Sequence, residues 1–156
     1  MRRKDREISN IEEIVEIIKK CDSCSLALFD ETYPYIIPMN FGYKCDGNNI
    51  YLYFHSANSG KKLDLMKKNN KVAFEMNTSH KLILNEVACN STMEFESVCG
   101  NGEIKILDES EKLSALTCIM NQYKENVEHK IDEKIVKEVV LIELCVNDVW
   151  GKRLKK

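Results

Sequence analysis

A strand that leads directly into a basic helix start is encoded in the middle of the chain, where residues 50–62 read IYLYFHSANSGKK. Residues 50–55 alternate Ile, Leu and Phe with Tyr, Tyr and His, and this two-residue period is typical of a strand. Small and polar residues follow, and Ser59–Met66 then has the pattern of a short helix with a basic first turn. We therefore expect the strand to end at the amino terminus of that helix.

This helix start has the properties of a phosphate site. The first turn of a helix presents unpaired N–H groups and a partial positive charge, and Lys61 and Lys62 add two full charges there. Such an arrangement would bind a phosphate well. Local physics alone leaves a second interpretation open, in which the helix is simply capped and its lysines are solvated.

Strand patterns dominate on both sides of this stretch. They predict strands at 25–29, 35–44, 50–55, 71–78 and 138–146, and two strand segments, 93–99 and 103–107, separated by a bulge or sharp bend at Gly100–Gly102. Helices are expected at 11–20, behind a capping box at Ser9–Glu12, and from Asp108 and Glu111 to Val127, with a helical turn near 132–136. The sequence therefore predicts a mainly β protein with about six mostly antiparallel strands and flanking helices.

Length and composition are those of a single globular domain. The 156 residues suit one domain, 1–156, and 44% of them are hydrophobic while 31% are charged. The 23 basic and 25 acidic residues nearly cancel, so no net field would hold nucleic acid. No apolar run approaches the roughly 20 residues that cross a bilayer, and no secretion signal is recognisable, so we expect a cytoplasmic protein without membrane contacts.

The seven cysteines are odd in number and scattered along the chain, so free, mostly buried thiols are expected. Cys21 and Cys24 form a C-x-x-C pair, which is typical of half a zinc site or of a redox dithiol. Zinc would need a second such pair or paired histidines, and the remaining cysteines are isolated. We therefore predict no metal site, and the role of Cys21 and Cys24 stays open.

Several segments share a pattern with one known superfamily. The most specific is H-S-A-x-x-G-K-K at residues 55–62, and P-x-N-F-G-Y at residues 38–43 supports it. The matching segments as a whole are Pro34–Tyr43, Ile50–Ala57, Gly60–Lys62, Val72–Glu75 and Phe95–Val98. Together they resemble the pyridoxamine 5'-phosphate oxidase-like superfamily, and within it the nitroimidazole-resistance type of flavoprotein.

This resemblance implies a split β-barrel that forms a homodimer, with one FMN in each of two clefts between the subunits. By the same resemblance, the FMN phosphate and ribityl chain would lie among His55, Ser56, Ala57, Gly60, Lys61 and Lys62. The isoalloxazine ring would lie along residues that offer backbone groups to its edge, namely Met39, Asn40 and Phe41. Glu96 and Ser97 are further candidates on a neighbouring strand.

His55 and Trp150 each allow a functional and a structural interpretation. His55 could donate a proton during catalysis, or it could be a hydrogen-bonded side chain at the end of a strand. Residues 150–154 follow the last predicted strand, and Trp150 could reach the flavin of the partner subunit, as C-terminal segments do in the wider superfamily. An exposed tail anchored by Trp150 is the alternative.

The resemblance implies an FMN-dependent oxidoreductase that passes electrons from a reduced nicotinamide donor to a small acceptor such as a nitroaromatic. In that case the protein supplies binding, orientation and electrostatics. A true pyridoxamine phosphate oxidase has several arginines for a second phosphate, whereas this chain has only Arg2, Arg3, Arg6 and Arg153, so synthesis of pyridoxal phosphate is not expected. The alternative from a different class is a non-enzymatic flavin or haem protein that stores cofactor or senses redox state.

Overall fold

The computed structural model describes residues 3–123, 132, 136 and 138–156. The helices in these residues are α1 (Ile11–Ile18), α2 (Lys61–Lys68) and α3 (Glu109–Gln122), with short 3-10 turns at Lys4–Arg6 and Ala88–Asn90. The strands are β1 (Glu7–Ile8), β2 (Cys24–Leu28), β3 (Tyr35–Met39), β4 (Phe41–Asp46), β5 (Asn49–Ser56), β6 (Lys71–Ile83), β7 (Thr92–Ile106) and β8 (Val140–Leu154). None of the helices in this described part is long and apolar enough to cross a membrane.

The strands form one antiparallel sheet that nearly closes on itself. From edge to edge the order is β3-β2-β6-β7-β8-β5-β4, and the short β1 pairs with β8. β3 and β4 lie at opposite edges of the sheet although only Asn40 separates them in sequence. The chain therefore crosses from one edge to the other at Asn40. This open seam makes the fold a split β-barrel with flanking helices, as predicted.

The seam corrects the prediction of one continuous strand at 35–44. Met39 pairs with Cys24 of β2, whereas Phe41 pairs with Phe54 of β5, so the backbone changes partner at Asn40. With this division and the short β1, the described residues form eight strands, against about six expected. A change of partner depends on pairing between distant segments, which the local alternation of side chains does not record.

The core lies inside the curved sheet. Leu52 and Phe54 of β5 point inward and are fully buried, because alternate residues of a strand face the same side. α1 covers one end of this core with Ile14, Ile17 and Ile18, each at most 1% exposed. Burial of side chains of this size contributes about 1.5–3 kcal/mol each, so tertiary packing rather than intrinsic propensity holds this short helix.

α3 packs on the opposite face of the sheet, over β4 and β5. Its Ala115 and Ile119 are buried against Tyr53 and Leu141 in a second, smaller apolar cluster. The helix approaches the sheet so closely at Gly42 of β4 that a Cβ there would overlap the α3 backbone at Cys118. Glycine at this position is therefore a packing requirement.

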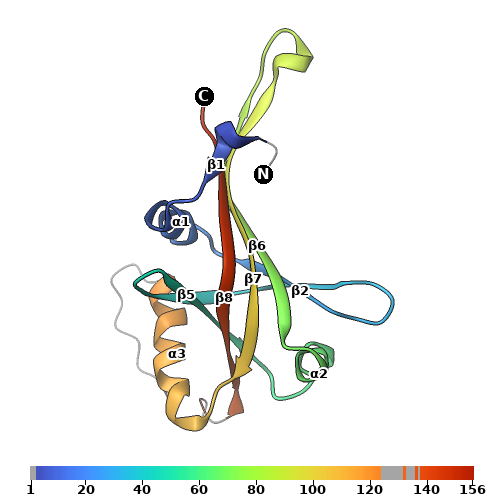
Figure 1. Cartoon of the computed structure of the whole chain (residues 1–156), viewed down its shortest axis with the longest axis vertical. Coiled ribbons are helices and arrows are strands. Elements are labelled where there is room, and N and C mark those ends of the chain that lie inside the picture. The colour runs from blue at the N-terminus through green and yellow to red at the C-terminus, as the bar shows by residue number, and fades with distance from the viewer. Residues whose placement is uncertain (1–2, 124–131, 133–135, 137) are drawn as a thin grey trace.

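β6 and β7 form a long hairpin that extends past the rest of the sheet in Figure 1. β6 contains a bulge between Thr78 and Lys81, where Ser79 has a φ of +59°. β7 runs as one strand from Thr92 to Ile106, so the predicted division into two strands is wrong. The predicted bulge is confirmed, because the register of β7 with β8 shifts between Asn101 and Gly102. Gly102 also permits close packing, because a Cβ there would overlap the Cys145 carbonyl of β8.

The amino-terminal helix begins and ends slightly differently from the prediction. Its cap is Asn10, whose side-chain oxygen accepts a hydrogen bond from the Glu13 N–H, rather than Ser9. The helix ends at Ile18 instead of continuing to residue 20. Cap choice within a Ser-Asn pair is decided by backbone geometry that composition does not reveal.

The carboxyl-terminal half also differs from the prediction at its boundaries. α3 starts behind Asp108, whose N–H donates to the Glu111 carboxylate, as expected. The predicted continuation of α3 to Val127 and most of the turn at 132–136 lie outside the described residues. β8 continues to Leu154, well past its predicted end at residue 146.

Candidate functional site

The turn between β5 and α2 has the geometry of a ligand-binding helix start. β5 ends at Ser56 and α2 begins at Lys61, with exposed residues between them. Gly60 caps the helix with φ +130° and ψ 162°, a conformation that residues other than glycine rarely adopt. The predicted strand-to-helix element is therefore present as a sharp turn.

The first turn of α2 leaves backbone donors for a ligand. The N–H groups of Leu63 and Asp64 donate to the Gly60 carbonyl at 3.0 and 3.3 Å. The N–H groups of Lys61 and Lys62 have no intrahelical acceptor, because they stand before the first closed turn, and no side chain caps the helix at Gly60. An anion at this end would meet both donors and the positive end of the helix dipole.

Ser56 supplies an independent sign of a ligand at the same place. Its side chain is 3% exposed, and its Oγ is buried without a hydrogen-bond partner. A buried hydroxyl without a partner costs about 1–3 kcal/mol, so natural structures seldom keep one. A phosphate oxygen beside the β5–α2 turn would accept this hydrogen bond, so the residues present fit a phosphate group.

Lys61 is already paired with a neighbouring loop. Its Nζ lies 2.7 Å from Asp30 Oδ2, and 5.2 Å from the centroid of the Tyr35 ring. The hydrogen bond with Asp30 raises the pKa of Lys61, so the ammonium stays charged at neutral pH. No local pattern predicted the role of Asp30, because the contact joins the loop after β2 to α2. Lys62, next to it, is half-buried.

His55 and Ser56 do not converge on one point. The side chains of β5 alternate between the two faces of the sheet, so His55 is exposed on one side while Ser56 is buried on the other. Ala57 follows the end of the strand and is exposed. A ligand bound by Ser56 and the α2 start would therefore touch His55 only by reaching around the strand end.

The predicted ring-edge residues come close to this turn. Phe41 pairs with Phe54, and this register brings Asn40 next to the His55–Ser56 end of β5. Met39 and Phe41 are buried in the core at 8% and 0% exposure, whereas Asn40 is exposed. The Asn40 side chain is thus the accessible one of the three.

Tyr123, directly after α3, contacts the seam and was not predicted as a site residue. Its hydroxyl accepts hydrogen bonds from the Phe41 N–H at 2.9 Å and from Asn40 Nδ2 at 3.3 Å. The helical spacing of apolar residues predicted only that Tyr123 would pack on a helix face. No local signal reports that its hydroxyl reaches a strand more than eighty residues earlier.

Ser97 and Trp150 lie on the outer face of the sheet, away from the β5–α2 turn. Ser97 pairs with Lys152 and Cys99 with Trp150 across β7 and β8, which places these side chains on one face. Trp150 belongs to β8, so the predicted tail after the last strand is wrong. β8 pairs with the long β7 from Ile142 to Leu154, with one register shift opposite Asn101 and Gly102.

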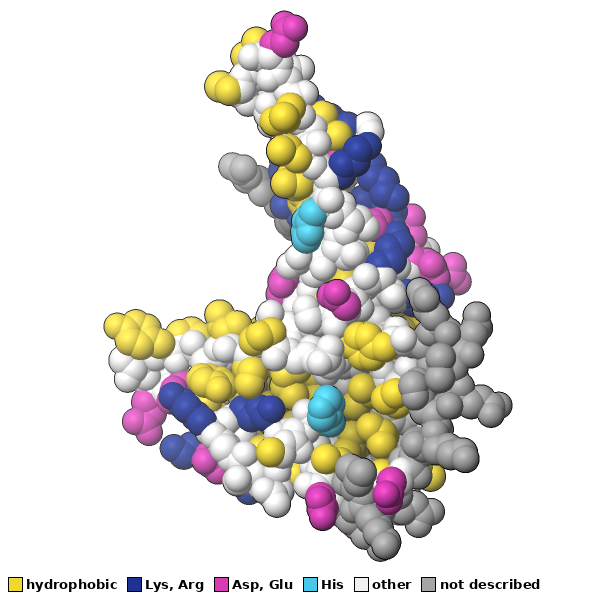
Figure 2. Space-filling view, turned by 180° about the vertical axis from the view of Figure 1, so that it is seen from behind, with side chains coloured by type: hydrophobic (Ala, Val, Ile, Leu, Met, Phe, Trp, Pro, Cys, Tyr) yellow, Lys and Arg dark blue, Asp and Glu magenta, His cyan; other side chains and the backbone are white. Residues whose placement is uncertain are grey.

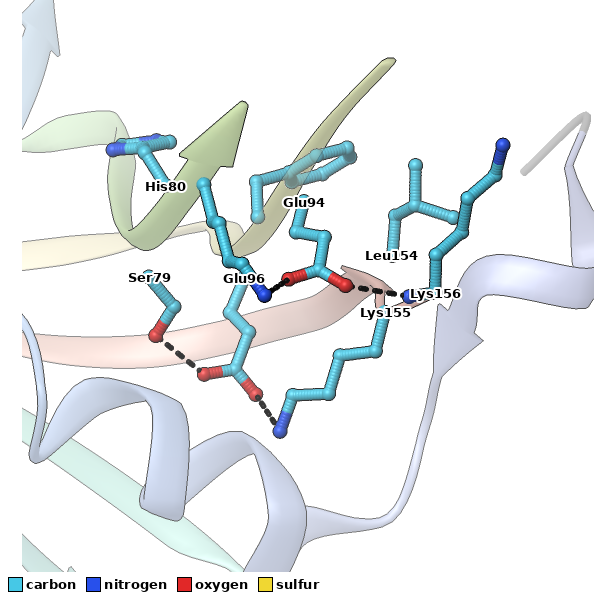
Figure 3. A pocket seen from close by; sticks show the side chains of 9 residues that line it. Ser79, His80, Glu94, Glu96, Leu154, Lys155 and Lys156 are labelled. Atoms are coloured by element: carbon cyan, nitrogen blue, oxygen red, sulfur yellow. Dashed lines mark hydrogen bonds and ion pairs between the residues drawn. The ribbon is translucent and has the colours of Figure 1, made fainter. Parts of the chain in front are cut away.

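Glu96 belongs to a separate ion-pair cluster at the base of the β6–β7 hairpin. It is 1% exposed and accepts hydrogen bonds from Lys20 Nζ at 2.7 Å, Ser79 Oγ at 2.8 Å and Arg153 Nε at 2.6 Å. Burial would raise the pKa of Glu96, but these hydrogen bonds outweigh burial and lower the pKa to about 2. Figure 3 shows Glu96 beside a cavity of about 480 Å³ whose polar groups mostly pair with one another.

The cysteines are free thiols, as predicted, but only Cys21 and Cys24 are buried, so the prediction of mostly buried thiols is wrong. Burial raises the pKa of both thiols, to about 12 for Cys21, so both stay protonated at neutral pH. Within residues 3–123, 132, 136 and 138–156, no group of three or more His, Cys, Asp or Glu side chains could hold a metal ion. The C-x-x-C pair is therefore part of the core.

The fold is a split β-barrel with a free helix start at the end of a strand. Residues 10–153 match the family described as pyridoxamine 5'-phosphate oxidase, and the chain belongs to this family. No curated protein matches the sequence.

Solved structures similar to the chain include a proposed 5-nitroimidazole antibiotic resistance protein from Bacteroides thetaiotaomicron. It is 32% identical, with a TM-score of 0.82 over 94% of this chain and 86% of that one. A flavocytochrome from Azotobacter vinelandii is 15% identical, with a TM-score of 0.82 over 100% and 72% of the two chains. An FAD- and haem-binding protein from Mycobacterium smegmatis is 13% identical, with a TM-score of 0.83 over 97% and 74%. The last two proteins share the fold of this chain.

Proposed function

We propose that the chain binds FMN, with the FMN phosphate at the start of α2. The observation that carries this proposal is the buried Ser56 hydroxyl without a partner, beside a helix start whose N–H groups are uncapped. Gly60, Lys61 and Lys62 follow Ser56 within six residues and would add backbone donors and positive charge. The flavin and haem proteins among the similar structures support a flavin, and a single phosphate-type site among the described residues favours FMN.

A second copy of the chain would complete the cleft around FMN. Among the described residues, α3 covers the outer face over β4, β5 and the start of β8, and Ser97 and Trp150 lie on the same face farther along β7 and β8. Large apolar side chains are exposed near this face and on the β6–β7 hairpin: Phe29, Tyr33, Ile36, Leu82, Leu84, Val87 and Trp150. Figure 2 shows apolar side chains on both sides of a hollow between that hairpin and the β2–β3 turn. Contiguous apolar surface of this kind favours a stable homodimer.

The proposed activity is transfer of electrons from a reduced nicotinamide donor to a small acceptor such as a nitroaromatic, in the cytoplasm. The similarity to the proposed 5-nitroimidazole resistance protein supports this acceptor class. Bound FMN would supply the redox chemistry, while the residues of this chain bind and orient it. His55, exposed at the end of β5, is the proposed proton donor from the other side of the strand.

Replacement of Ser56 by Ala tests the phosphate site, because it should stabilise the protein without FMN and weaken its binding of FMN. In the protein without FMN, the variant removes an unsatisfied buried hydroxyl, so the free energy of unfolding in urea should rise by up to about 1 kcal/mol. The dissociation constant for FMN should nevertheless increase about three- to tenfold, because a hydrogen bond to phosphate is lost. Unchanged FMN affinity would contradict the assignment.

Charge reversal at the helix start provides a second test. Lys61→Glu should abolish measurable uptake of FMN, followed by visible absorption and by mass analysis of the released cofactor. Asp30→Asn is the matched control for the broken ion pair, and Lys67→Glu is the control for charge at the other end of α2. Both controls should keep FMN, and loss of FMN in all three variants would contradict a specific role for Lys61.

Activity and assembly need separate measurements. We expect the FMN-loaded protein to oxidise a reduced nicotinamide when a nitroaromatic acceptor is present, and to run as a dimer in size-exclusion chromatography with light scattering. Bound FMN without turnover would favour the non-enzymatic flavin protein. A haem-like absorption band would favour a haem-binding protein, and a monomer would contradict the shared cleft.

A further inference from the structure

The hydroxyl of Tyr123 lies at the seam where the chain crosses from β3 to β4. It accepts hydrogen bonds from the Phe41 N–H and from Asn40 Nδ2, and it donates to the Asp22 carbonyl oxygen at 2.9 Å. A phenolic hydroxyl has one hydrogen to donate and two lone pairs to accept, so its hydrogen bonds are complete. One side chain therefore ties the end of α3 to the seam and to the loop before β2.

These contacts determine which way the Asn40 carboxamide faces. Asn40 Nδ2 also donates to the Asp22 carbonyl oxygen, at 3.3 Å. A carbonyl oxygen can only accept, so the amide nitrogen of Asn40 must occupy this position. The amide oxygen, Oδ1, is then directed to the opposite side. Because Asn40 is exposed, its side chain presents an acceptor at the surface of the seam.

The seam lies beside the proposed phosphate turn. Phe41 pairs with Phe54, so Asn40 is next to the end of β5 that carries Ser56. An isoalloxazine ring has one ring N–H between two carbonyl groups, and this N–H requires an acceptor. If the Asn40 amide is already held with its oxygen outward, binding does not have to stop its rotation. This oxygen would then favour the edge of the ring that carries the N–H.

We propose that Tyr123 is a positioning residue for the flavin ring, and that it holds Asn40 so that Oδ1 accepts a hydrogen bond from the ring N–H. This inference rests on the proposed FMN site. Tyr123 itself does not touch the flavin, since its hydroxyl is occupied by Asn40, Phe41 and Asp22. It acts by fixing the orientation of a neighbouring amide.

Gln122 offers a matched comparison at the same end of α3. Its Nε2 donates to the carbonyl oxygens of Ile18 and Cys21 at 3.1 and 2.7 Å. It thus ties α3 to the end of α1, as Tyr123 ties α3 to the seam. Gln122 has no contact with Asn40 or Phe41 among its hydrogen bonds, so its loss should affect stability without affecting the orientation of the amide.

The experiment compares the full-length wild type with Tyr123→Phe, Gln122→Ala and Asn40→Ala. For each protein we would measure the FMN dissociation constant by fluorescence titration, the visible spectrum and midpoint potential of bound FMN, and the urea midpoint. Tyr123→Phe and Asn40→Ala should each weaken FMN binding about three- to tenfold and change the spectrum of the bound ring. Gln122→Ala should lower the urea midpoint and leave FMN binding unchanged.

The outcomes separate this inference from the function on which it rests. A wild type that takes up no FMN refutes the proposed function and the inference together. A wild type that binds FMN, with Tyr123→Phe or Asn40→Ala unchanged in affinity and spectrum, refutes the inference alone. The inference is also refuted if Gln122→Ala weakens FMN binding as much as Tyr123→Phe does, because the end of α3 would then have only a structural effect. If Tyr123→Phe does not fold, the FMN affinity and the spectrum of Asn40→Ala decide the test.

Discussion

Replacement of Glu96 by Gln should destabilise the protein and remove part of its sensitivity to acid. The carboxylate is 1% exposed and binds Lys20 at the end of α1, Ser79 in the bulge of β6 and Arg153 near the end of β8. These segments are distant in sequence, so the single charge at Glu96 joins three parts of the fold. A neutral amide would remove the anion that Lys20, Arg153 and Lys155 share, although Arg153 would keep Glu13 at 3.5 Å.

The magnitude follows from the pKa of Glu96, which is about 2 instead of the ordinary 4.5. The difference, 4.5 minus about 2, corresponds to roughly 3 kcal/mol at 1.36 kcal/mol for each pKa unit. Lys20 and Arg153 are 42% and 26% exposed, and solvent screening reduces the expected contribution to about 2 kcal/mol. Because the pKa is lower in the folded than in the unfolded protein, this contribution is present above pH 4.5 and is lost as the pH falls toward 2.

Urea unfolding of the wild type and Glu96→Gln, at pH 7 and at steps down to about pH 2.5, measures this effect. At pH 7 the variant should lose about 2 kcal/mol, and the gap to the wild type should narrow as the pH falls. Glu94→Gln is the control, because Glu94 lies on the same strand but accepts its close hydrogen bond from the Lys156 backbone N–H, at 2.7 Å. A variant as stable as the wild type at pH 7, or a gap that persists in acid, would refute the reasoning.

Three further changes test other parts of the structure. Gly42→Ala should lower the free energy of unfolding in urea by about 1–3 kcal/mol, because its Cβ would overlap the α3 backbone, and an equally stable variant would contradict that packing. Gly60→Ala should destabilise by about 1–3 kcal/mol through its φ of +130°, and FMN titration should show weaker binding as the α2 start is distorted. Cys21 and Cys24 should resist a thiol-reactive dye in the folded protein and react on unfolding, because burial raises the pKa of both thiols, and rapid labelling followed by peptide mass analysis would argue against their burial.

Local sequence patterns predicted the parts of the fold that local contacts determine. The alternation in residues 50–55 predicted β5, which runs from Asn49 to Ser56. The pattern at Ser59–Met66 predicted α2, which runs two residues later, from Lys61 to Lys68. The same patterns placed a continuous strand at 35–44 and a division of β7 at its glycines. The continuous strand and the division into two strands were wrong, because partner exchange at Asn40 and close packing at Gly102 depend on strands that are distant in sequence. The bulge expected at the glycines is present, as a register shift with β8 between Asn101 and Gly102.

The candidate site shows the same division between local and distant causes. His55 and Ser56 are neighbours in the predicted phosphate element, yet the pleat of β5 sends them to opposite faces of the sheet. Asp30 pairs with Lys61, and Tyr123 contacts Asn40. Both Asp30 and Tyr123 lie in segments that the motif does not contain. A motif therefore identifies where a phosphate can bind, whereas the orientation of each group around it is decided by the segments that the fold brings alongside.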